Sequence, residues 1–404
     1  MAPGPRAATG LSPTGRAGRS IPSMKAVALL VAAGRGTRFG GEVPKQAAAL
    51  LGRPVLRHAA EALLREGGVD AIQPVSAPGE EAALAAMLDG LPILPPVAGG
   101  ATRQESVRRG LEALAADPPD IVLVHDAARP VVPPGTVAAL LAALAEVPGA
   151  IPALPVSDTL KRGEAGQITE TVPRAGLFRA QTPQAFRFGA LLAAHRAVAD
   201  EVTDDAQLLE AAGLPVALVA GHDSNVKITW PEDLVRVEAA MLARMTPRMG
   251  TGFDVHRIVE GRPMVLCGVV IPCPFGLDGH SDADVGIHAL CDAIYGALAE
   301  GDIGRWFPPS EMQWKDADSA RFLRHAAERI AARGGVLANV DVTLICEQPK
   351  ITPHAQAMRT RLAELLGVEI GRVSVKATTS ERLGFTGRGE GIAAQAAATV
   401  LLPS

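Results

Sequence analysis

The strongest constraint on the fold is an apolar run, Lys25–Ala33, that ends abruptly in a glycine-rich loop. A continuous run of Val, Leu and Ala is typical of a central strand that is buried on both faces of a parallel sheet. Strand and helix patterns then alternate, with helices expected at 54–66, 102–115 and 231–244 and strands at 71–76, 121–124, 150–155 and 216–220. The alternation predicts a doubly wound α/β domain that binds ligands beyond the carboxyl ends of its strands.

A second set of elements begins after a short connector, residues 246–249. Strands are expected at 249–256, 340–345 and 372–378, and helices at 282–298, 319–332 and 354–366. These elements predict a compact α/β or α+β domain. The expected organisation is therefore a tail (1–23), a first domain (24–245) and a second domain (246–404).

Composition excludes several classes of protein. A chain of 404 residues is too long for one typical hydrophobic core. A net charge of -4 and only 3% aromatic residues argue against a nucleic-acid partner. No apolar run reaches the roughly 18 residues that a membrane span needs. The four cysteines form no CxxC pair, which argues against a zinc knuckle and favours a reduced, cytoplasmic protein.

The first 23 residues hold arginines, no acids and many Gly, Pro and Ala. This composition is vaguely like that of a transit peptide, but the segment lacks the apolar region of a secretory signal. The expectation is a disordered tail, or a true start at Met24.

The loop after the first apolar run carries residue types that bind phosphate. Gly34 and Gly36 allow a tight turn that points N–H groups at phosphate oxygens. Arg38 and Lys45 add positive charge where a triphosphate and its transition state are negative. The spacing matches neither G-x-G-x-x-G nor a Walker loop. The alternative at this point is a glycine-rich turn with solvated basic residues.

The second half carries a cluster of potential metal ligands. Asp254 and His256 are two residues apart on an expected strand and so share a face. Asp284, His288 and Asp292 are spaced by four and share one face of an expected helix. Two histidines and a carboxylate suit a catalytic zinc site with an open fourth position. Asp292 is placed to orient His288. The alternative is that each histidine is an ordinary polar residue.

Eight segments of the first half occur together and in order: AAGRGTRFG, VPKQ, GGATRQES, VHDAARP, PVSDTLK, TPQAF, TDDAQ and NVKIT. In this combination the first half resembles the 2-C-methyl-D-erythritol 4-phosphate cytidylyltransferases. The resemblance implies a Rossmann-like nucleotidyltransferase domain with a β-arm.

The resemblance also implies roles for individual residues. The CTP phosphates, which carry Mg²⁺, would be held by Gly34, Gly36, Arg38 and Lys45, and the two basic residues would stabilise the transition state. Cytosine would be read by Gly100, Ala101 and Ser106, mostly through the backbone and one hydroxyl. The family often has an acid where Ala101 stands. Asp126 and Arg129 would lie at the substrate and ribose side, and methylerythritol phosphate would be held by Thr159, Arg174, Thr203 and Lys227.

Segments of the second half, TGFDVHR, GHSDADVGIHALCDA, GDIGRWFP, NVDVTLI, QPKITPH and KATTSERLGFTGRGEG, resemble the 2-C-methyl-D-erythritol 2,4-cyclodiphosphate synthases. The resemblance implies zinc on Asp254, His256 and His288, and Mg²⁺ or Mn²⁺ on Glu381. It assigns phosphate positioning to His280, Ser281 and Thr379. Asp302 and Gly304 would bind the ribose or erythritol part, while residues 350–353 and 377–379, Thr378 among them, would flank the cytosine. Phe385 and Arg388 would lie toward a trimer centre. Pro309 stands where the family commonly has an acid.

Together the two resemblances predict one bifunctional isoprenoid-precursor enzyme. It would assemble as a hexamer from dimer and trimer contacts, with a possible transient contact to the separate kinase of the intervening step. One alternative is a sugar-phosphate nucleotidyltransferase fused to an unrelated metal-dependent phosphate enzyme. A non-enzyme alternative is a nucleotide-sensing module with a structural zinc domain.

Overall fold

The computed structural model describes residues 24–34, 39–40, 44–198, 202–308 and 310–403. Residues 1–35 with 56–225 form one compact unit, and residues 36–55 with 226–404 form another. Within the described residues, no helix combines the length and apolar character needed to cross a membrane.

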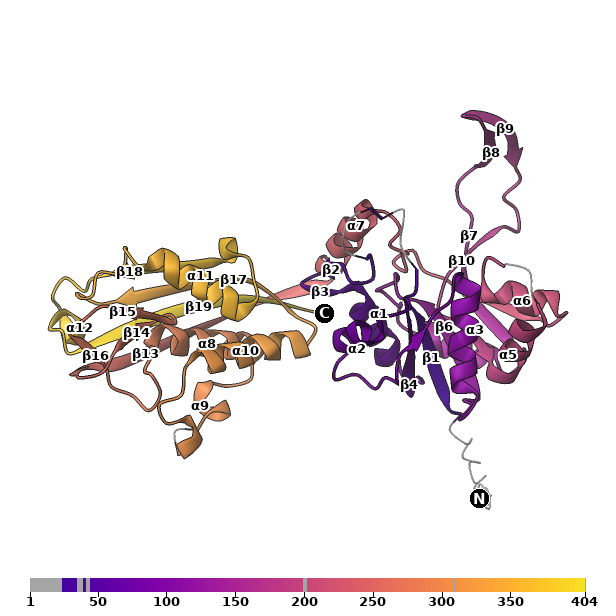
Figure 1. The fold of residues 1–404 in the computed structure, drawn as a ribbon. Helices are drawn as coiled ribbons and strands as arrows, with labels where there is room; N and C mark the ends of the chain where they lie inside the picture. Colours follow the sequence, from indigo (N-terminus) through magenta and orange to yellow (C-terminus); the bar gives the residue numbers. More distant parts are fainter. Residues whose placement is uncertain (1–23, 35–38, 41–43, 199–201, 309, 404) are drawn as a thin grey trace, which may run out of the picture. The chain divides into compact units, whose positions relative to one another are not determined.

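The first unit is built on one eight-stranded sheet, coloured indigo to magenta in Figure 1. Its order is β10-β7-β11-β6-β1-β4-β5, with β12 beside β7. The bounds are β1 (Ala26–Val31), β4 (Ala71–Ser76), β5 (Val97–Ala98), β6 (Ile121–Asp126), β7 (Gly149–Pro155), β10 (Phe178–Ala180), β11 (Gln184–Arg187) and β12 (Val216–Ala220). Strand β1 runs parallel to β4 and β6, whereas β11 is antiparallel to β6 and β7.

Helices cover both faces of this sheet. One core contains side chains of α1 (Val55–Arg65), α2 (Glu81–Met87) and α4 (Thr136–Ala143). The other contains side chains of α3 (Arg103–Leu114), α5 (Phe188–Ala197) and α6 (Asp205–Ala211). Along β1, Ala28 and Leu30 enter the first core, while Val27 and Leu29 enter the second. This two-residue alternation, buried on both sides, explains the continuous apolar run and confirms the predicted doubly wound domain.

A two-stranded arm extends from the sheet beyond β7 and β10 (Figure 1). It consists of β8 (Leu160–Glu164) and β9 (Gln167–Val172), whose residues are almost all exposed. The arm that the family resemblance implied is therefore present.

The second unit contains a five-stranded sheet of order β16-β13-β19-β17-β18. Its elements, yellow to orange in Figure 1, are β13 (Met245–Glu260), β14 (Met264–Leu266), β15 (Val269–Ile271), β16 (Phe275–Leu277), α8 (Val285–Leu298), α9 (Ile303–Trp306), η1 (Met312–Trp314), α10 (Ala320–Ala332), β17 (Val336–Ile345), α11 (Ala355–Leu366), η2 (Ile370–Arg372), β18 (Val373–Thr378), α12 (Gly384–Gly387) and β19 (Gly391–Pro403). Helices α8, α10 and α11 share one hydrophobic core with the sheet. The unit also includes β2 (Ala49–Leu50), β3 (Arg53–Pro54) and α7 (Pro231–Leu242).

Two sequence expectations are wrong here. The connector expected at 246–249 is the first part of β13, and it pairs with the C-terminal strand β19 from Met245↔Pro403 onward. The strand expected at 372–378 is not the last one, because β19 follows it. The alanine-rich composition of β19 hides its strand character, since alanine carries little strand propensity. The boundary between residues 245 and 246 stays a prediction.

Strand β13 lies unusually close to helix α8, and two glycines make this possible. A Cβ atom on Gly252 would lie 2.0 Å from the carbonyl oxygen of Ala289, and one on Gly250 would lie 2.1 Å from that of Ala293. At these two points the backbone of β13 is in direct contact with the backbone of α8, so only glycine fits.

We expect Gly252→Ala to lower the free energy of unfolding by about 1–3 kcal/mol, as overpacking of a tight contact does. Gly371→Ala is the matched control, because a Cβ atom there meets nothing within 4 Å. Guanidinium unfolding of both variants measures the difference. Equal free energies of unfolding for the two variants would show that the fold does not need the close approach of β13 to α8.

Candidate active sites

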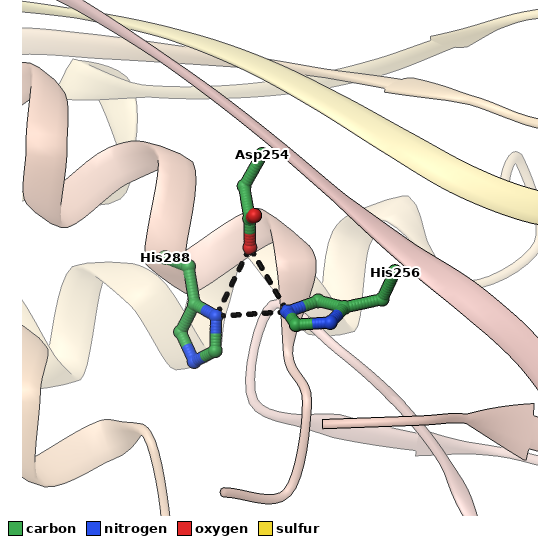
Figure 2. Close-up of side chains that lie close together, drawn as sticks. All are labelled: Asp254, His256 and His288. Atoms are coloured by element: carbon green, nitrogen blue, oxygen red, sulfur yellow. Dashed lines mark hydrogen bonds and ion pairs between the residues drawn. The ribbon is translucent and has the colours of Figure 1, made fainter. Parts of the chain in front are cut away.

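Three potential metal ligands converge where β13 passes the start of α8. Asp254 and His256 project from the same face of β13, and His288 projects from the first turn of α8 (Figure 2). The Oδ2 atom of Asp254 lies 3.0 Å from both His256 Nε2 and His288 Nδ1, and the two nitrogens are 3.1 Å apart. The structure thus brings together the three ligands that the sequence predicted.

The spacing of these three atoms fits a metal ion. Zinc binds histidine nitrogen and carboxylate oxygen at about 2.0–2.2 Å, and atoms 3.0–3.1 Å apart are close enough together for one ion to reach all three. Three protein ligands leave a fourth position for water or substrate, as catalytic zinc sites do.

The electrostatics of the triad favour a bound cation. Burial alone would raise the pKa of Asp254, but hydrogen bonds from His256 and His288 outweigh it and hold that pKa well below its usual range. Burial lowers the pKa of His256, yet Asp254 and a hydrogen bond to the backbone of Asp278 raise it overall.

The start of α8 is fixed by Asp284, which the sequence placed on the same helix face as His288. Asp284 is instead the N-cap, fully buried, and its carboxylate accepts hydrogen bonds from the backbone N–H groups of Cys267, Gly268, Gly286 and Ile287. This cap sets the position of the first helical turn and therefore of His288.

The expected role of Asp292 is wrong. Its Oδ1 atom accepts a hydrogen bond from Ile303 N at 2.7 Å and so joins α8 to α9. The Nε2 atom of His288 instead faces two hydroxyls, Ser319 Oγ at 3.0 Å and Ser281 Oγ at 3.1 Å. Ser319 carried no signal that sequence reasoning used.

The other residues predicted for this site lie on neighbouring segments with contacts of their own. Buried Ser281 reaches the triad through His288, whereas His280 is exposed. Asp302 caps α9, within which Gly304 lies. Thr378 is the last residue of β18, and Thr379, which follows it, donates to Glu381 Oε1 at 2.8 Å. Pro309 lies outside the described residues.

Two further predicted residues belong to the segment around α12. Phe385 is partly exposed, and the Arg388 guanidinium makes two hydrogen bonds to the Glu390 carboxylate. Glu381, just before this helix, has φ of 53°, a left-handed conformation that costs a non-glycine residue energy. Its strained backbone is consistent with a constrained functional loop.

The predicted phosphate loop is described only in part. Gly34 lies three residues beyond the carboxyl end of β1, while Gly36 and Arg38 lie outside the described residues. Lys45 donates from Nζ to the carbonyl of Ile228 at 3.3 Å. The structure therefore places Lys45 beside the segment that carries Lys227, which is distant in sequence.

The loop predicted to read cytosine is held by the start of α3. Ser106 accepts a hydrogen bond from Gly100 N at 3.0 Å and donates to Thr102 O at 2.8 Å. Ala101 N donates to Glu105 Oε2 at 2.8 Å. The Ser106 hydroxyl is thus used to shape the loop.

A buried charge network fixes Asp126 at the end of β6. Arg103 Nε lies 3.2 Å from Asp126 Oδ1, and Arg103 Nη1 lies 2.8 Å from Asp205 Oδ2. Asp205 also contacts His195 Nε2 at 3.2 Å, and Arg129 lies 3.9 Å from Asp126. The sequence pointed to Asp126 and Arg129 but not to Arg103 or Asp205, since nothing in the pattern of TDDAQ distinguishes a buried carboxylate from an exposed one.

The network keeps its groups charged despite burial. Burial would lower the pKa of Arg103, but Asp205 and Asp126 raise it above its usual range. Burial would raise the pKa of Asp205, but Arg103 and His195 lower it. Burial lowers the pKa of His125 to about 4, so this neighbour of Asp126 is neutral at pH 7.

Besides Lys227, the predicted methylerythritol phosphate ligands lie at the base of the arm and in the loop before α6. Thr159 precedes β8, and Arg174, which follows β9, donates to the carbonyl of Ser157 two residues from Thr159. Thr203 contacts Gln207 Oε1 through both its N–H and its hydroxyl.

Arg103→Met should lower the free energy of unfolding by about 3–5 kcal/mol, because it leaves Asp205 and Asp126 without their shared cation. The lowered pKa of Asp205 contributes stability that is present above its unfolded value and lost as pH falls through the folded value. In the variant the folded pKa of Asp205 is no longer lowered by Arg103, so this pH-dependent contribution should be smaller. Arg196→Met, which breaks only an exposed pair with Glu112, is the control. Acid titrations that coincide for the two variants would contradict the network's role.

The fold and the two groups of residues define a class: an enzyme that couples a nucleotidyltransferase domain to a second domain with three side chains that could hold a metal ion. Residues 26–243 match the model of the family "2-C-methyl-D-erythritol 4-phosphate cytidylyltransferase", and residues 247–401 match the "YgbB family".

Full-length relatives carry both domains in the same order. The chain is 62% identical to the bifunctional enzyme IspD/IspF of Granulibacter bethesdensis over 94% of this chain and 100% of the relative. It is 60% identical to that of Gluconobacter oxydans over 94% and 99%. The solved structure of the bifunctional IspDF from Campylobacter jejuni is 32% identical and covers 94% of this chain and 98% of its own, with a TM-score of 0.46.

The chain belongs to the family of bifunctional IspD/IspF enzymes. It therefore combines a cytidylyltransferase with a cyclodiphosphate synthase of the methylerythritol phosphate pathway. The expected alternatives, an unrelated metal-dependent phosphate enzyme in the second half and a nucleotide-sensing module, are excluded by this membership.

Proposed function

We propose that the first domain uses Lys45 and Lys227 to transfer CMP from CTP to methylerythritol phosphate. A phosphate oxygen of methylerythritol phosphate forms a bond to the α-phosphorus of CTP, the bond to the β-phosphate oxygen breaks, and diphosphate leaves. The observation that supports the roles of the lysines is the 3.3 Å contact of Lys45 with the carbonyl next to Lys227. Two ammonium groups there would offset the charge that builds up on the phosphates.

Further residues complete this proposed site. Gly34, Gly36 and Arg38 would hold the CTP phosphates, with Mg²⁺ carried by the nucleotide. Gly100, Ala101 and Ser106 would shape the cytosine pocket. Asp126 and Arg129 would lie at the ribose side, and Thr159, Arg174 and Thr203 would contact methylerythritol phosphate.

We infer that the second domain closes the 2-phosphorylated product into the cyclodiphosphate. A 2-phosphate oxygen forms a bond to the β-phosphorus, the bond to the α-phosphate oxygen breaks, and CMP leaves. Asp254, His256 and His288 would hold Zn²⁺, and Glu381 would hold Mg²⁺ or Mn²⁺. When bound, the two ions would neutralise the crowded phosphates. The 3.0–3.1 Å triangle of ligand atoms is the observation that carries this proposal.

The other predicted residues of the second domain would orient the substrate. His280, Ser281 and Thr379 would position phosphates, and Asp302 and Gly304 would bind the ribose or erythritol part. Thr378 would flank the cytosine, while Phe385 and Arg388 would face a trimer centre. All four cysteines carry free thiols, which supports the cytoplasmic location that we propose.

Paired variants test whether each site carries out its own reaction. Lys45→Ala should lower diphosphate release from CTP and methylerythritol phosphate by about 100- to 1,000-fold, as loss of one transition-state stabiliser does. Its release of CMP from the phosphorylated intermediate should be normal. Lys25→Ala, which removes an exposed lysine paired with Asp117, is the matched control. Near-normal diphosphate release by Lys45→Ala would refute the assignment.

His288→Ala should show the reverse pattern. Loss of one of three ligands should abolish zinc binding and CMP release but leave diphosphate release from CTP intact. Metal analysis of the purified variant together with both assays decides the point. Full zinc content in His288→Ala would rule out the proposed ligand set.

We also propose that six chains assemble as three dimers that bridge two trimers, since both symmetries can then be satisfied together. Exposed apolar side chains on the arm region, Ile168, Leu177 and Phe178, support one contact, and Met249, Phe253 and Val255 on β13 support the other. Light scattering should give the mass of a hexamer. A monomeric protein with both activities would contradict the assembly.

The two domains should also be active when they are separated. Because β13 begins at Met245 and pairs with β19 along its length, the chain should be divided between Arg244 and Met245. The fragment of residues 24–244 should release diphosphate, and the fragment of residues 245–404 should release CMP, because each folds around its own hydrophobic core. Folded but inactive fragments would show that the sites depend on each other.

A further inference from the structure

The ring nitrogen of His288 that points away from the triad meets a short chain of hydrogen bonds. Ser319, fully buried at the N-cap of α10, places its Oγ atom 3.0 Å from His288 Nε2. The same Oγ atom lies 2.5 Å from Asp282 Oδ1, and Ser319 N donates to Asp282 Oδ2 at 3.1 Å. Asp282 thus holds Ser319 through both carboxylate oxygens.

The chemistry of these groups fixes the direction of each bond. An ionised carboxylate can only accept, so the Ser319 hydroxyl donates its proton to Asp282. The lone pairs of Ser319 Oγ then remain as acceptors, and the partner that faces them must donate. His288 therefore carries its proton on Nε2 and donates to Ser319.

In a neutral ring, the proton on Nε2 leaves Nδ1 bare. Without a cation, the Asp254 carboxylate 3.0 Å away can also hold a proton on Nδ1, and a cation that binds there displaces this proton. This Nδ1 atom is the one that faces Asp254 and His256. A histidine binds a metal ion only through an unprotonated nitrogen. The chain from Asp282 to His288 therefore keeps the remaining ring proton on Nε2 when a cation takes Nδ1.

Ser281 fits the same arrangement. Its Oγ atom accepts a hydrogen bond from Ala283 N at 3.2 Å and lies 3.1 Å from His288 Nε2 and 3.5 Å from Ser319 Oγ. With the proton on Nε2, the Ser281 hydroxyl can direct its own proton to the second lone pair of Ser319. No donor then competes for Nε2.

We propose that Asp282 and Ser319 are positioning residues that fix the tautomer and orientation of His288 and so present its Nδ1 lone pair to a divalent cation. This inference rests on the metal-binding part of the proposed function. Outer partners of a metal-bound histidine raise its affinity for metal by holding the ring and its tautomer. Here the partner is the Ser319 hydroxyl, which can only accept from His288 because its own proton is donated to Asp282.

Zinc affinities of four variants of the full chain test the proposal, measured by competition with a chromophoric chelator. Ser319→Ala and Asp282→Ala should each weaken zinc binding by about 10- to 100-fold. Asp318→Ala is the matched control, because Asp318 also caps α10, through Ala320 N at 2.8 Å, but does not touch the histidine. Its zinc affinity should equal that of the parent.

The double variant Asp282→Ala/Ser319→Ala gives the sharpest test. Without Asp282, the Ser319 hydroxyl is released and can donate to Nε2, which favours the tautomer with a proton on Nδ1. Removal of Ser319 eliminates that competing donor. The double variant should therefore bind zinc no more weakly than Asp282→Ala alone, whereas independent effects would multiply.

Imidazole ¹⁵N chemical shifts provide a readout that a merely structural role would not change. In the metal-free parent, Nε2 of His288 should be protonated, whether or not Nδ1 also carries a proton, and in Asp282→Ala the proton on Nε2 should be lost in favour of Nδ1. Unchanged zinc affinities in both single variants, additive losses in the double variant, or an unchanged tautomer would overturn the inference alone. Absence of zinc binding in the parent protein would overturn the proposed metal site as well.

Discussion

The direct contact between β13 and α8 is the constraint on which the second active site depends. Gly250 and Gly252 let the strand backbone rest on the carbonyl oxygens of the helix. Asp254 and His256 follow on the same strand, and His288 directly precedes Ala289, whose carbonyl oxygen meets Gly252. A larger separation would pull Asp254 and His256 away from His288, so the convergence of the three side chains is a consequence of backbone packing.

The first unit positions its polar groups by a different principle. Its sheet is buried on both faces, and the ends of its strands carry charged residues that must be neutralised locally. Arg103 does this for Asp126 and Asp205 at once. The result is an ionised carboxylate held rigidly at the edge of the sheet where ligands bind in this architecture.

Most of the architecture and the triad could be predicted from the sequence. The two-residue period of a strand placed Asp254 and His256 on one face, and the apolar run of β1 indicated a sheet covered on both sides. Partners that are remote in sequence could not be predicted. Asp292 has the correct helical spacing to support His288, but Ser319, 31 residues away, occupies that place. The buried partnership of Arg103 with Asp205, 102 residues apart, likewise follows only from tertiary packing.

X-ray absorption spectroscopy of the zinc-loaded protein tests the central claim most directly. A catalytic three-ligand centre on Asp254, His256 and His288 predicts two imidazole nitrogens and one carboxylate oxygen at about 2.0–2.2 Å, with a further light atom from solvent. In the His288→Ala variant, the zinc should have one imidazole neighbour fewer, or the protein should no longer bind zinc. A sulfur scatterer at about 2.3 Å, or a closed set of four protein ligands, would contradict the account.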